Sequence, residues 1–272
     1  MTRALDDYLS TLVDMGSEVL TNSLRLWKNG VQSEQAFWTR WFETQGLEWP
    51  ADFKERQIDR DVPSWLSTLF PPGRGEVSIL DVGSGPLPKI GNKHPNRPVR
   101  VLAADPLAHF YNELVSQHLP QGTPIPVIFS FAEDLSCRFE PESFDLINCT
   151  NALDHSVAPM WALLEMTLIL KKNGKIILSH RRNEATVENY EGFHQWNFDI
   201  SNENDNLIFW NESNTINVNS ILGDYCSIKH LTPKDSEYIT SIIVKESYPN
   251  FDSLRYHRIL RACLLEAMLE IA

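Results

Sequence analysis

The chain has 272 residues, 42% of them hydrophobic, which is enough to bury one substantial core. Its 36 acidic and 24 basic residues give a net charge of −12, so no basic surface for a phosphate backbone is expected and nucleic acid is excluded as a substrate. The four cysteines, Cys137, Cys149, Cys226 and Cys263, form no Cys-x-x-Cys pair. This spacing argues against a disulfide framework and a zinc site, so we expect no metal and a reducing, cytoplasmic location.

The amino terminus is polar and acidic, unlike a secretory signal, and no stretch approaches the ~20 apolar residues of a membrane helix. We therefore expect a soluble protein without a membrane partner. An apolar helical pattern in the tail from Asp252 predicts a helix that packs on the sheet or pairs with a second subunit, giving a monomer or a homodimer.

Helical periodicity predicts a first helix from Leu5 to about Gly30, a second from Ser33 to Gly46, and a short third over residues 63–70. We expect residues 1–72 to form a helical cap. The second helix carries four aromatic side chains, at Phe37, Trp38, Trp41 and Phe42. They either pack the cap onto the rest of the protein or line a substrate pocket.

Residues 77–82 and 99–104 are almost continuously apolar, which is typical of buried parallel strands. The first strand leads into Gly83 and Gly85, where positive φ angles and close backbone approach to a ligand are possible. The second strand leads into Asp105, placed to accept hydrogen bonds from a ribose diol. This arrangement predicts a nucleoside-cofactor site.

Two further predicted strands, residues 144–149 and 170–178, complete a series of motifs in a fixed order. Over residues 76–180 the chain resembles the class I S-adenosylmethionine-dependent methyltransferases, with Leu-Asp-x-Gly-x-Gly, Asp-Pro, Ala-Glu-x-Leu and Phe-Asp-x-Ile among the matching motifs. The resemblance implies a three-layer α/β Rossmann-like fold, with a mostly parallel seven-stranded sheet that has an antiparallel edge strand. It also implies the cofactor S-adenosyl-L-methionine and the product S-adenosyl-L-homocysteine. The implied cofactor-binding residues are Asp81, Gly83, Ser84, Gly85, Asp105, Pro106, Ala132, Glu133 and Asn151.

The chain departs from this family pattern in two places. Four prolines in residues 86–98 predict a short or irregular segment where a helix normally follows the glycine turn, which leaves open how the methionine end of the cofactor is held. Relatives often have an acid where this chain has Phe131. The contact to the adenine amino group then falls to Glu133 or to backbone, and Phe131 offers a ring face to the base.

Polar residues follow the third strand of the series at Asn151, Asp154 and His155, near the place where a methyl group would be transferred. His155 is either a catalytic or substrate-contacting residue or a local cap of the helix that starts near Pro159. A mixed aromatic and amide segment, residues 190–198, then predicts a substrate lid, with a packed surface loop as the alternative. Residues 206–210 and 215–219 predict a β-hairpin, and residues 225–231 and 238–244 the last two sheet strands.

The predicted organisation is a cap (1–72), a cofactor-binding core (73–185), a lid and hairpin insertion (186–222), and the end of the sheet with a C-terminal helix (223–272). The expected activity is methyl transfer to an oxygen or nitrogen of a small molecule, such as a natural-product or sugar-like intermediate. The candidate bases are His155, His180 and His194. The candidate substrate-binding residues are Asp154, Tyr190, Phe193, Gln195, Trp196 and Asn197. The alternatives are a peptide or protein methyltransferase and a non-catalytic member that binds the cofactor or a partner chain.

Overall fold

The computed structural model describes residues 4–5, 7–8, 18–233, 235–248 and 262. Seven strands form one sheet in the order β3-β2-β1-β4-β5-β10-β9. Its strands are β1 (Val77–Val82), β2 (Val99–Asp105), β3 (Val127–Phe129), β4 (Phe144–Thr150), β5 (Leu170–Arg181), β9 (Cys226–His230) and β10 (Tyr238–Lys245). The first five pair in parallel, whereas β10 runs antiparallel to both β5 and β9. This is the predicted Rossmann-like methyltransferase sheet; its antiparallel strand is β10, with β9 outside it.

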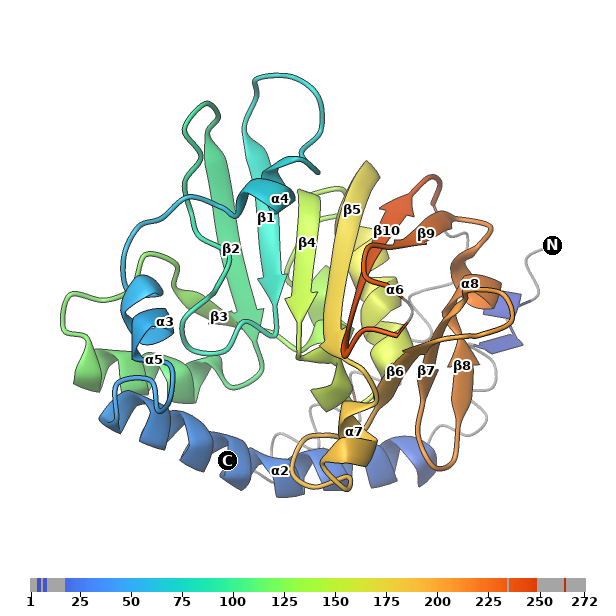
Figure 1. The fold of residues 1–272 in the computed structure, drawn as a ribbon, viewed down its shortest axis with the longest axis horizontal. Helices are drawn as coiled ribbons and strands as arrows, with labels where there is room; N and C mark the ends of the chain where they lie inside the picture. The colour runs from blue at the N-terminus through green and yellow to red at the C-terminus, as the bar shows by residue number, and fades with distance from the viewer. Residues whose placement is uncertain (1–3, 6, 9–17, 234, 249–261, 263–272) are drawn as a thin grey trace.

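The strand order reverses at β1, because the chain proceeds to β2 and β3 on one side and then to β4 and β5 on the other. In open α/β sheets ligands bind at this point, beyond the carboxyl ends of the strands. A 26-residue helix, α2 (Glu18–Glu43), crosses directly below these ends in Figure 1. The N-terminal cap is therefore placed over the expected ligand crevice.

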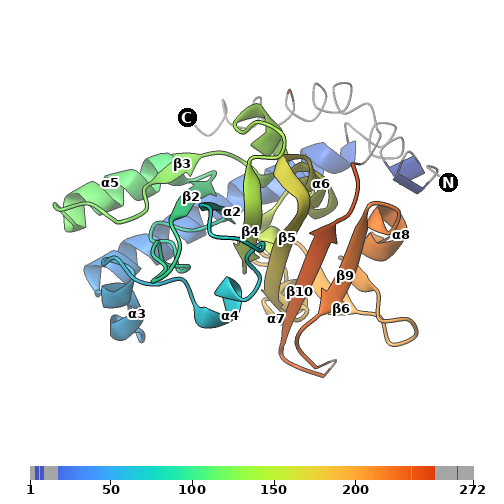
Figure 2. The same cartoon turned by 90° about the horizontal axis from the view of Figure 1, so that it is seen from above.

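Both faces of the sheet are covered, as the continuous apolar strands predicted. On one face Leu80 and Ile147 pack with α6 (Pro159–Ile169), a helix buried almost all round. On the other face Ile79 and Leu146 pack with Leu66 of α4 (Ser64–Ser67). Figure 2 shows α6 and α4 on opposite sides of the strands. The remaining helical segments are α3 (Pro50–Glu55), α5 (Ala108–His118), η1 (Ala132–Cys137), η2 (Leu153–His155), α7 (Glu184–Val187) and α8 (Val218–Leu222).

The predicted break between two N-terminal helices is wrong, because α2 continues through Gly30. The glycine serves packing instead: a Cβ at this position would lie 2.2 Å from Cδ1 of Phe193 and 2.8 Å from the carbonyl oxygen of Gly192. Gly46, by contrast, follows the helix with a φ of 109° and donates to the carbonyl of Trp41 at 2.8 Å, as a terminating glycine should. The sequence missed α3, and α4 is shorter than predicted.

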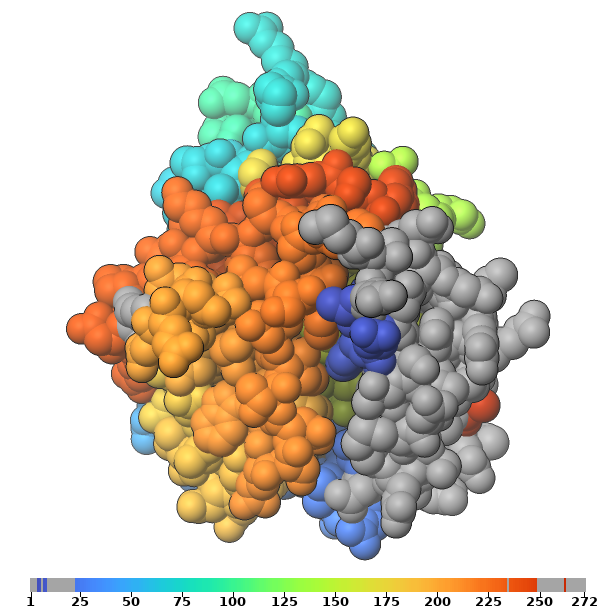
Figure 3. All heavy atoms as spheres, turned by 90° about the vertical axis from the view of Figure 1, so that its right-hand side faces the viewer, coloured from blue at the N-terminus to red at the C-terminus, as the bar shows by residue number. Residues whose placement is uncertain are grey.

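Residues 86–98 contain no helix, as the prolines predicted. The predicted hairpin is present as β7 (Leu207–Trp210) and β8 (Thr215–Asn217), and β6 (Asn197–Ile200) joins it to make a three-stranded antiparallel sheet. Figure 3 shows this part of the chain, coloured orange, forming one face of the molecule. Residues 6 and 9–17 of the helix expected from Leu5, and all of the predicted tail helix except Ala262, lie outside the described residues. No described helix is both long enough and apolar enough to span a membrane. The predicted domain boundaries stay predictions.

Candidate active site

One cavity of about 840 Å³ lies along the carboxyl ends of β1, β2 and β4 and extends to α2. Eleven of the predicted site residues border it: Asp81, Gly83, Ser84, Gly85, Asp105, Pro106, Ala132, Glu133, Asn151, His155 and Phe193. All nine residues expected to bind the cofactor are among them. The volume is in the range of small-molecule sites.

The glycine turn after β1 is shaped by two positive φ angles, 65° at Gly83 and 63° at Gly85. A Cβ on Gly83 would lie 2.2 Å from the Cβ of Ala152, and one on Gly85 would lie 3.0 Å from Cζ2 of Trp38. Side chains at these positions would therefore strain the backbone and fill the space between the turn and its neighbours. The turn is kept as bare backbone facing the cavity.

Asp105 is buried at the end of β2, where its carboxylate accepts hydrogen bonds from the backbone N–H groups of Leu107 at 2.9 Å and Gly85 at 3.1 Å. Burial raises the pKa of Asp105 to about 7, and these two hydrogen bonds only partly oppose the rise. Each carboxylate oxygen keeps a second lone pair for a ligand hydroxyl. The group is thus held in place and retains accepting capacity toward the cavity.

A second buried carboxylate, Asp81, accepts a hydrogen bond from the amide of Asn148 at 2.7 Å, and burial raises its pKa to about 6. The positive charge of Arg56, which follows α3, acts on Asp81 in the opposite direction. Arg56 pairs with Asp52 at 2.5 Å and donates to the carbonyl of Leu87 at 3.1 Å. Its Nε is buried and has no hydrogen-bond partner among the described residues. This end of the cavity therefore offers both a carboxylate and an incompletely satisfied guanidinium.

At the other end, Phe131 packs against Trp27 of α2 with ring centroids 5.3 Å apart. Glu133 is buried there, and burial raises its pKa to about 7. Its carboxylate accepts from the N–H of Ala158 at 3.0 Å, just before α6, so part of its accepting capacity is used by the fold. The expected contact of Glu133 with an adenine amino group stays a prediction.

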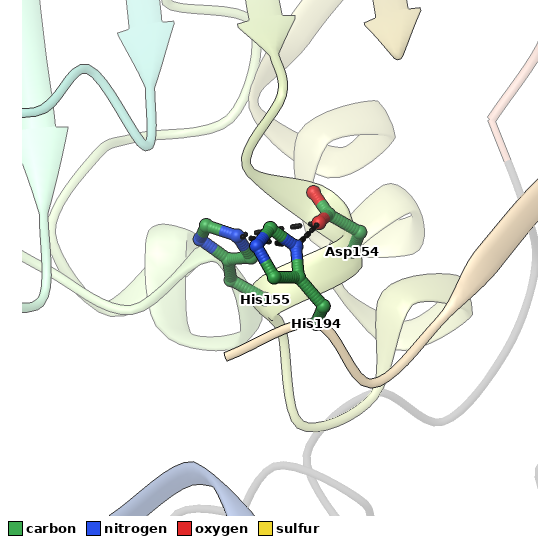
Figure 4. A group of neighbouring side chains, drawn as sticks. All are labelled: Asp154, His155 and His194. Carbon is green, nitrogen blue, oxygen red and sulfur yellow. Dashed lines mark hydrogen bonds and ion pairs between the residues drawn. The ribbon is translucent and has the colours of Figure 1, made fainter. Parts of the chain in front are cut away.

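The three candidate bases converge on one buried carboxylate, Asp154. His194 Nδ1 lies 2.9 Å and His155 Nε2 lies 3.2 Å from Asp154 Oδ2, while His180 Nδ1 lies 3.8 Å from Oδ1. Figure 4 shows the two shorter contacts and their geometry. Burial alone would raise the pKa of Asp154, but the surrounding histidines outweigh burial and hold it well below its usual range. Burial lowers the pKa of His194, but its hydrogen bond to Asp154 and the negative charges of Asp154, Glu184 and Glu188 together outweigh burial, so the net shift is upward.

Of these three histidines only His155 borders the cavity. His180 is 2% exposed and stacks on Phe198 at 4.3 Å. His194 lies behind His155 and contacts its Nε2 at 3.3 Å. The sequence placed the three candidates correctly near one strand edge, but only the packing distinguishes the one that faces the cavity.

Residues 190–198 form a packed wall, which favours the alternative of a structural segment over an open lid. Tyr190, Gln195, Trp196 and Asn197, all predicted to bind substrate, are absent from the cavity lining, as is Asp154. Asn197 is 0% exposed, accepts from the N–H of Thr186 and donates to the hydroxyl of Tyr190. The backbone N–H groups of Gln195 and Trp196 both donate to the carbonyl oxygen of Asp154. Phe193 alone reaches the cavity, stacked on Trp27 at 5.3 Å.

Sequence reasoning left open whether the cap aromatics line the site, and it named neither Trp27 nor Glu34. Trp27, Glu34 and Trp38 of α2 line the cavity, and Trp38 Nε1 donates to Glu34 at 2.7 Å. Among the four aromatic residues singled out from the sequence, only Trp38 does so, because Trp41 and Phe42 are buried against Phe53. Arg56, Arg60 and Lys89 were not predicted either. Their separation along the chain leaves no local signal.

Comparison with solved structures finds methyltransferases at low identity. The CurJ carbon methyltransferase is 15% identical with a TM-score of 0.44, and the alignment covers 65% of this chain and 50% of that one. A Mesorhizobium loti S-adenosylmethionine-dependent methyltransferase is 13% identical with a TM-score of 0.40, covering 64% and 94% of the two chains. Haemonchus contortus phosphoethanolamine N-methyltransferase 2, solved with S-adenosyl-L-methionine, is 12% identical with a TM-score of 0.44, covering 69% and 54%.

Comparison with curated protein sequences gives no significant match. A family model described as a methyltransferase domain does match, over residues 80–178. The matched region runs from β1 to β5 and contains the glycine turn, Asp105, Asp154 and His155, whereas His180 and His194 lie beyond it. It carries the motifs on which the resemblance was based. Residues 80–178 therefore match a methyltransferase domain, in agreement with the resemblance to the class I S-adenosylmethionine-dependent methyltransferases.

Proposed function

We propose that this protein transfers a methyl group from S-adenosyl-L-methionine to an oxygen or nitrogen atom of a small molecule and releases S-adenosyl-L-homocysteine. One observation carries the proposal. The same cavity is bordered by the glycine turn and Asp105 at one part of its wall and by the imidazole of His155 at another. Cofactor and acceptor can thus share one cavity.

The residues present fit the cofactor. The bare backbone of Gly83 leaves room that a Cβ would fill, and Asp105 offers free lone pairs to a ribose diol. At the methionine end, Asp81 suits an ammonium group and the partly unsatisfied guanidinium of Arg56 suits a carboxylate. Arg56 thereby replaces the helix that the proline-rich segment lacks. When bound, the cofactor supplies a methyl group on a sulfonium sulfur, an electrophile for in-line attack.

The acceptor is assigned to the part of the cavity near His155, where Asn151, Ser179 and Thr240 add polar groups. Holding two reactants aligned can account for most of the barrier reduction in such a reaction. An acceptor hydroxyl or amine must also lose a proton. His155, which borders the cavity, is the candidate base that would accept this proton. A small molecule is favoured over a peptide because α2 lines the cavity with Trp27, Glu34 and Trp38 and so covers one side of it.

Calorimetric titration with S-adenosyl-L-methionine and S-adenosyl-L-homocysteine tests the cofactor. We expect binding by the wild type and binding weakened by about 1–3 kcal/mol in Asp105→Ala, since the variant removes a charged acceptor. A folded sample that binds neither compound at millimolar concentration would contradict the proposal.

Cofactor carrying a labelled methyl group tests the acceptor class. Incubated with separated small-molecule and peptide fractions of a cell extract, the enzyme should label the small-molecule fraction only. An incubation without protein is the control for uncatalysed transfer, and Asp105→Ala is the control for label that does not depend on the cofactor site. Label in the peptide fraction would establish the peptide alternative, and slow cofactor turnover without label in either fraction would support a non-catalytic role.

A further inference from the structure

Three side-chain atoms of the Asp154 cluster form a small triangle. Asp154 Oδ2, His194 Nδ1 and His155 Nε2 are separated by 2.9, 3.2 and 3.3 Å, with the two nitrogens furthest apart. The residues come from η2 and from the 190–198 segment, and their ring edges and carboxylate point at one another in Figure 4. All three separations are within hydrogen-bonding or ion-pairing distance.

No placement of protons gives a hydrogen bond along all three sides of this triangle. If both nitrogens donate a proton to Asp154 Oδ2, no hydrogen bond joins the two nitrogens, which lie 3.3 Å apart. If only one carries a proton, the lone pair of the other nitrogen faces a carboxylate oxygen. A cation between the three atoms would make every contact favourable, because each atom can present a lone pair to it.

The dimensions suit a divalent transition metal. Zinc binds histidine nitrogen and carboxylate oxygen at about 2.0–2.2 Å, so tetrahedral geometry separates its ligand atoms by about 3.3–3.6 Å. The sides of 3.2 and 3.3 Å are close to this range, and the side of 2.9 Å would have to lengthen slightly. Two imidazoles and one carboxylate are also a ligand set that leaves coordination positions open. His155 borders the cavity, so an open position would face the space assigned to the acceptor.

Buried polar atoms without hydrogen-bond partners beside the triangle also favour a bound cation. Asp154 is 1% exposed, and its Oδ1 has no hydrogen-bond partner in the part of the chain that the structure describes; the same holds for both ring nitrogens of His180. A carboxylate so deeply buried requires positive charge. Glu184 interacts electrostatically with both Asp154 and His194 and adds negative charge at the edge of the cluster.

The ligand geometry is held by the backbone before any ion binds. The N–H groups of Gln195 and Trp196 donate to the carbonyl of Asp154 at 3.1 and 3.2 Å, which ties the segment carrying His194 to the one carrying Asp154 and His155. His180 lies 3.8 Å from Asp154 Oδ1, where a small shift would make it a hydrogen-bonding partner of the bound carboxylate. Such an outer partner is a common feature of metal sites.

We propose that His155, His194 and Asp154 bind one divalent transition metal ion, with zinc as the best match, at the edge of the methyl-transfer cavity. This goes against the expectation of no metal, and metal binding itself does not depend on the proposed function. If both hold, the ion takes over the role given to His155 in deprotonation, because a metal-bound imidazole nitrogen cannot accept a proton: the ion would polarise the acceptor, whose proton is lost to solvent. The freed lone pair then forms the bond to the methyl carbon, and the pair of the breaking carbon–sulfur bond stays on sulfur.

Titration of chelator-treated, full-length protein with zinc, and with cobalt(II) followed by visible absorption, tests the site. We expect one equivalent to bind, with a cobalt spectrum of tetrahedral or five-coordinate type. His194→Ala and His155→Ala should each weaken binding by at least about 100-fold, since even outer partners are worth 10–100-fold. His94→Ala, which removes a half-buried loop histidine whose ring accepts from the N–H of Asn96 and packs against Phe70, should stay within about threefold.

Circular dichroism and cofactor titration on the same variants separate loss of metal from loss of fold. Wild-type protein without stoichiometric zinc binding, or equal losses in His94→Ala and His194→Ala, would overturn the metal site and leave a proton-sharing cluster. Metal binding without any cofactor binding would instead reject the proposed function while keeping the metal site. The two failures are therefore distinguishable.

Discussion

The cofactor end and the acceptor end of the cavity are built in different ways. Gly83, Gly85 and Asp105 follow two neighbouring strands, so one short stretch of chain makes most of the cofactor end. The acceptor end combines α2, the residues after β4, and the wall formed by residues 190–198. The first depends on backbone conformation within a motif, and the second on contacts between segments distant in the chain. Substitutions at the cofactor end should therefore mainly weaken cofactor binding, whereas substitutions at the acceptor end should mainly lower the free energy of unfolding.

The largest expected effect is at the acceptor end, from Trp196→Ala. Trp196 is 6% exposed, so removal of its buried indole should lower the free energy of unfolding by about 3–5 kcal/mol. Chemical denaturation measures this. Trp49→Ala is the matched control, because Trp49 is 57% exposed and its loss should cost no more than about 0.5 kcal/mol. A stable Trp196→Ala protein with impaired turnover would restore the substrate-lid hypothesis.

At the cofactor end, Gly83→Ala should weaken S-adenosyl-L-methionine binding by roughly 100-fold, about 2.7 kcal/mol. The added methyl would lie 2.2 Å from the Cβ of Ala152, so the turn must move. Gly122→Ala controls for backbone strain alone, since Gly122 has a φ of 77° with nothing within 4 Å of an added Cβ. Calorimetry should find wild-type affinity for Gly122→Ala. Equal losses in both variants would mean that the clash is irrelevant.

Gly30→Ala distinguishes local helix preference from packing between the cap and the wall. Helix propensity alone predicts a gain of about 1 kcal/mol, whereas the contacts with Phe193 and Gly192 predict a net loss of about 1–3 kcal/mol. Asn29→Ala, on the exposed side of the same helix, should be neutral or slightly stabilising. Thermal unfolding of the two variants gives the sign. A stabilised Gly30→Ala protein would show that cap and wall are not tightly packed.

The sequence was sufficient for the sheet and the glycine turn because both have local signatures. A buried parallel strand is continuously apolar, and a glycine after it marks a positive φ. Gly30 shows where this reasoning ends: it has the same local signature as Gly46, yet its role is a contact with a segment more than a hundred residues away. Propensity cannot register such a contact.

The Asp154 cluster could not be predicted for a related reason. His155 and His194 are 39 positions apart, far from any short metal-ligand spacing, and a different segment brings His180 beside them. Sequence reasoning proposed all three histidines as independent bases. Packing around one buried aspartate makes them a single unit, whose protonation or metal content must be measured as a whole.

The smallest expected effect is the pH dependence of cofactor binding, which depends on Asp105. Its pKa is raised to about 7, so about 90% of the carboxyl is ionised at pH 8 and about 10% at pH 6. If the ribose is held by the ionised form, the dissociation constant for S-adenosyl-L-homocysteine should rise about tenfold between pH 8 and pH 6. Asp105→Asn should bind weakly at both values. A tenfold change that persists in Asp105→Asn would assign the titration to another group, such as Glu133.

Stability should respond to the same group in the opposite direction. In the unfolded chain Asp105 ionises near its ordinary pKa of about 3.9, so between about pH 4 and pH 7 the folded, ligand-free protein binds more protons than the unfolded one. Its free energy of unfolding should therefore fall as pH rises toward 7, while cofactor affinity increases. Melting curves of ligand-free protein at pH 6 and pH 8 should show this decline, and Asp105→Asn should reduce it. A carboxylate kept for ligand binding thus destabilises the empty fold, and bound cofactor is expected to offset that cost at neutral pH.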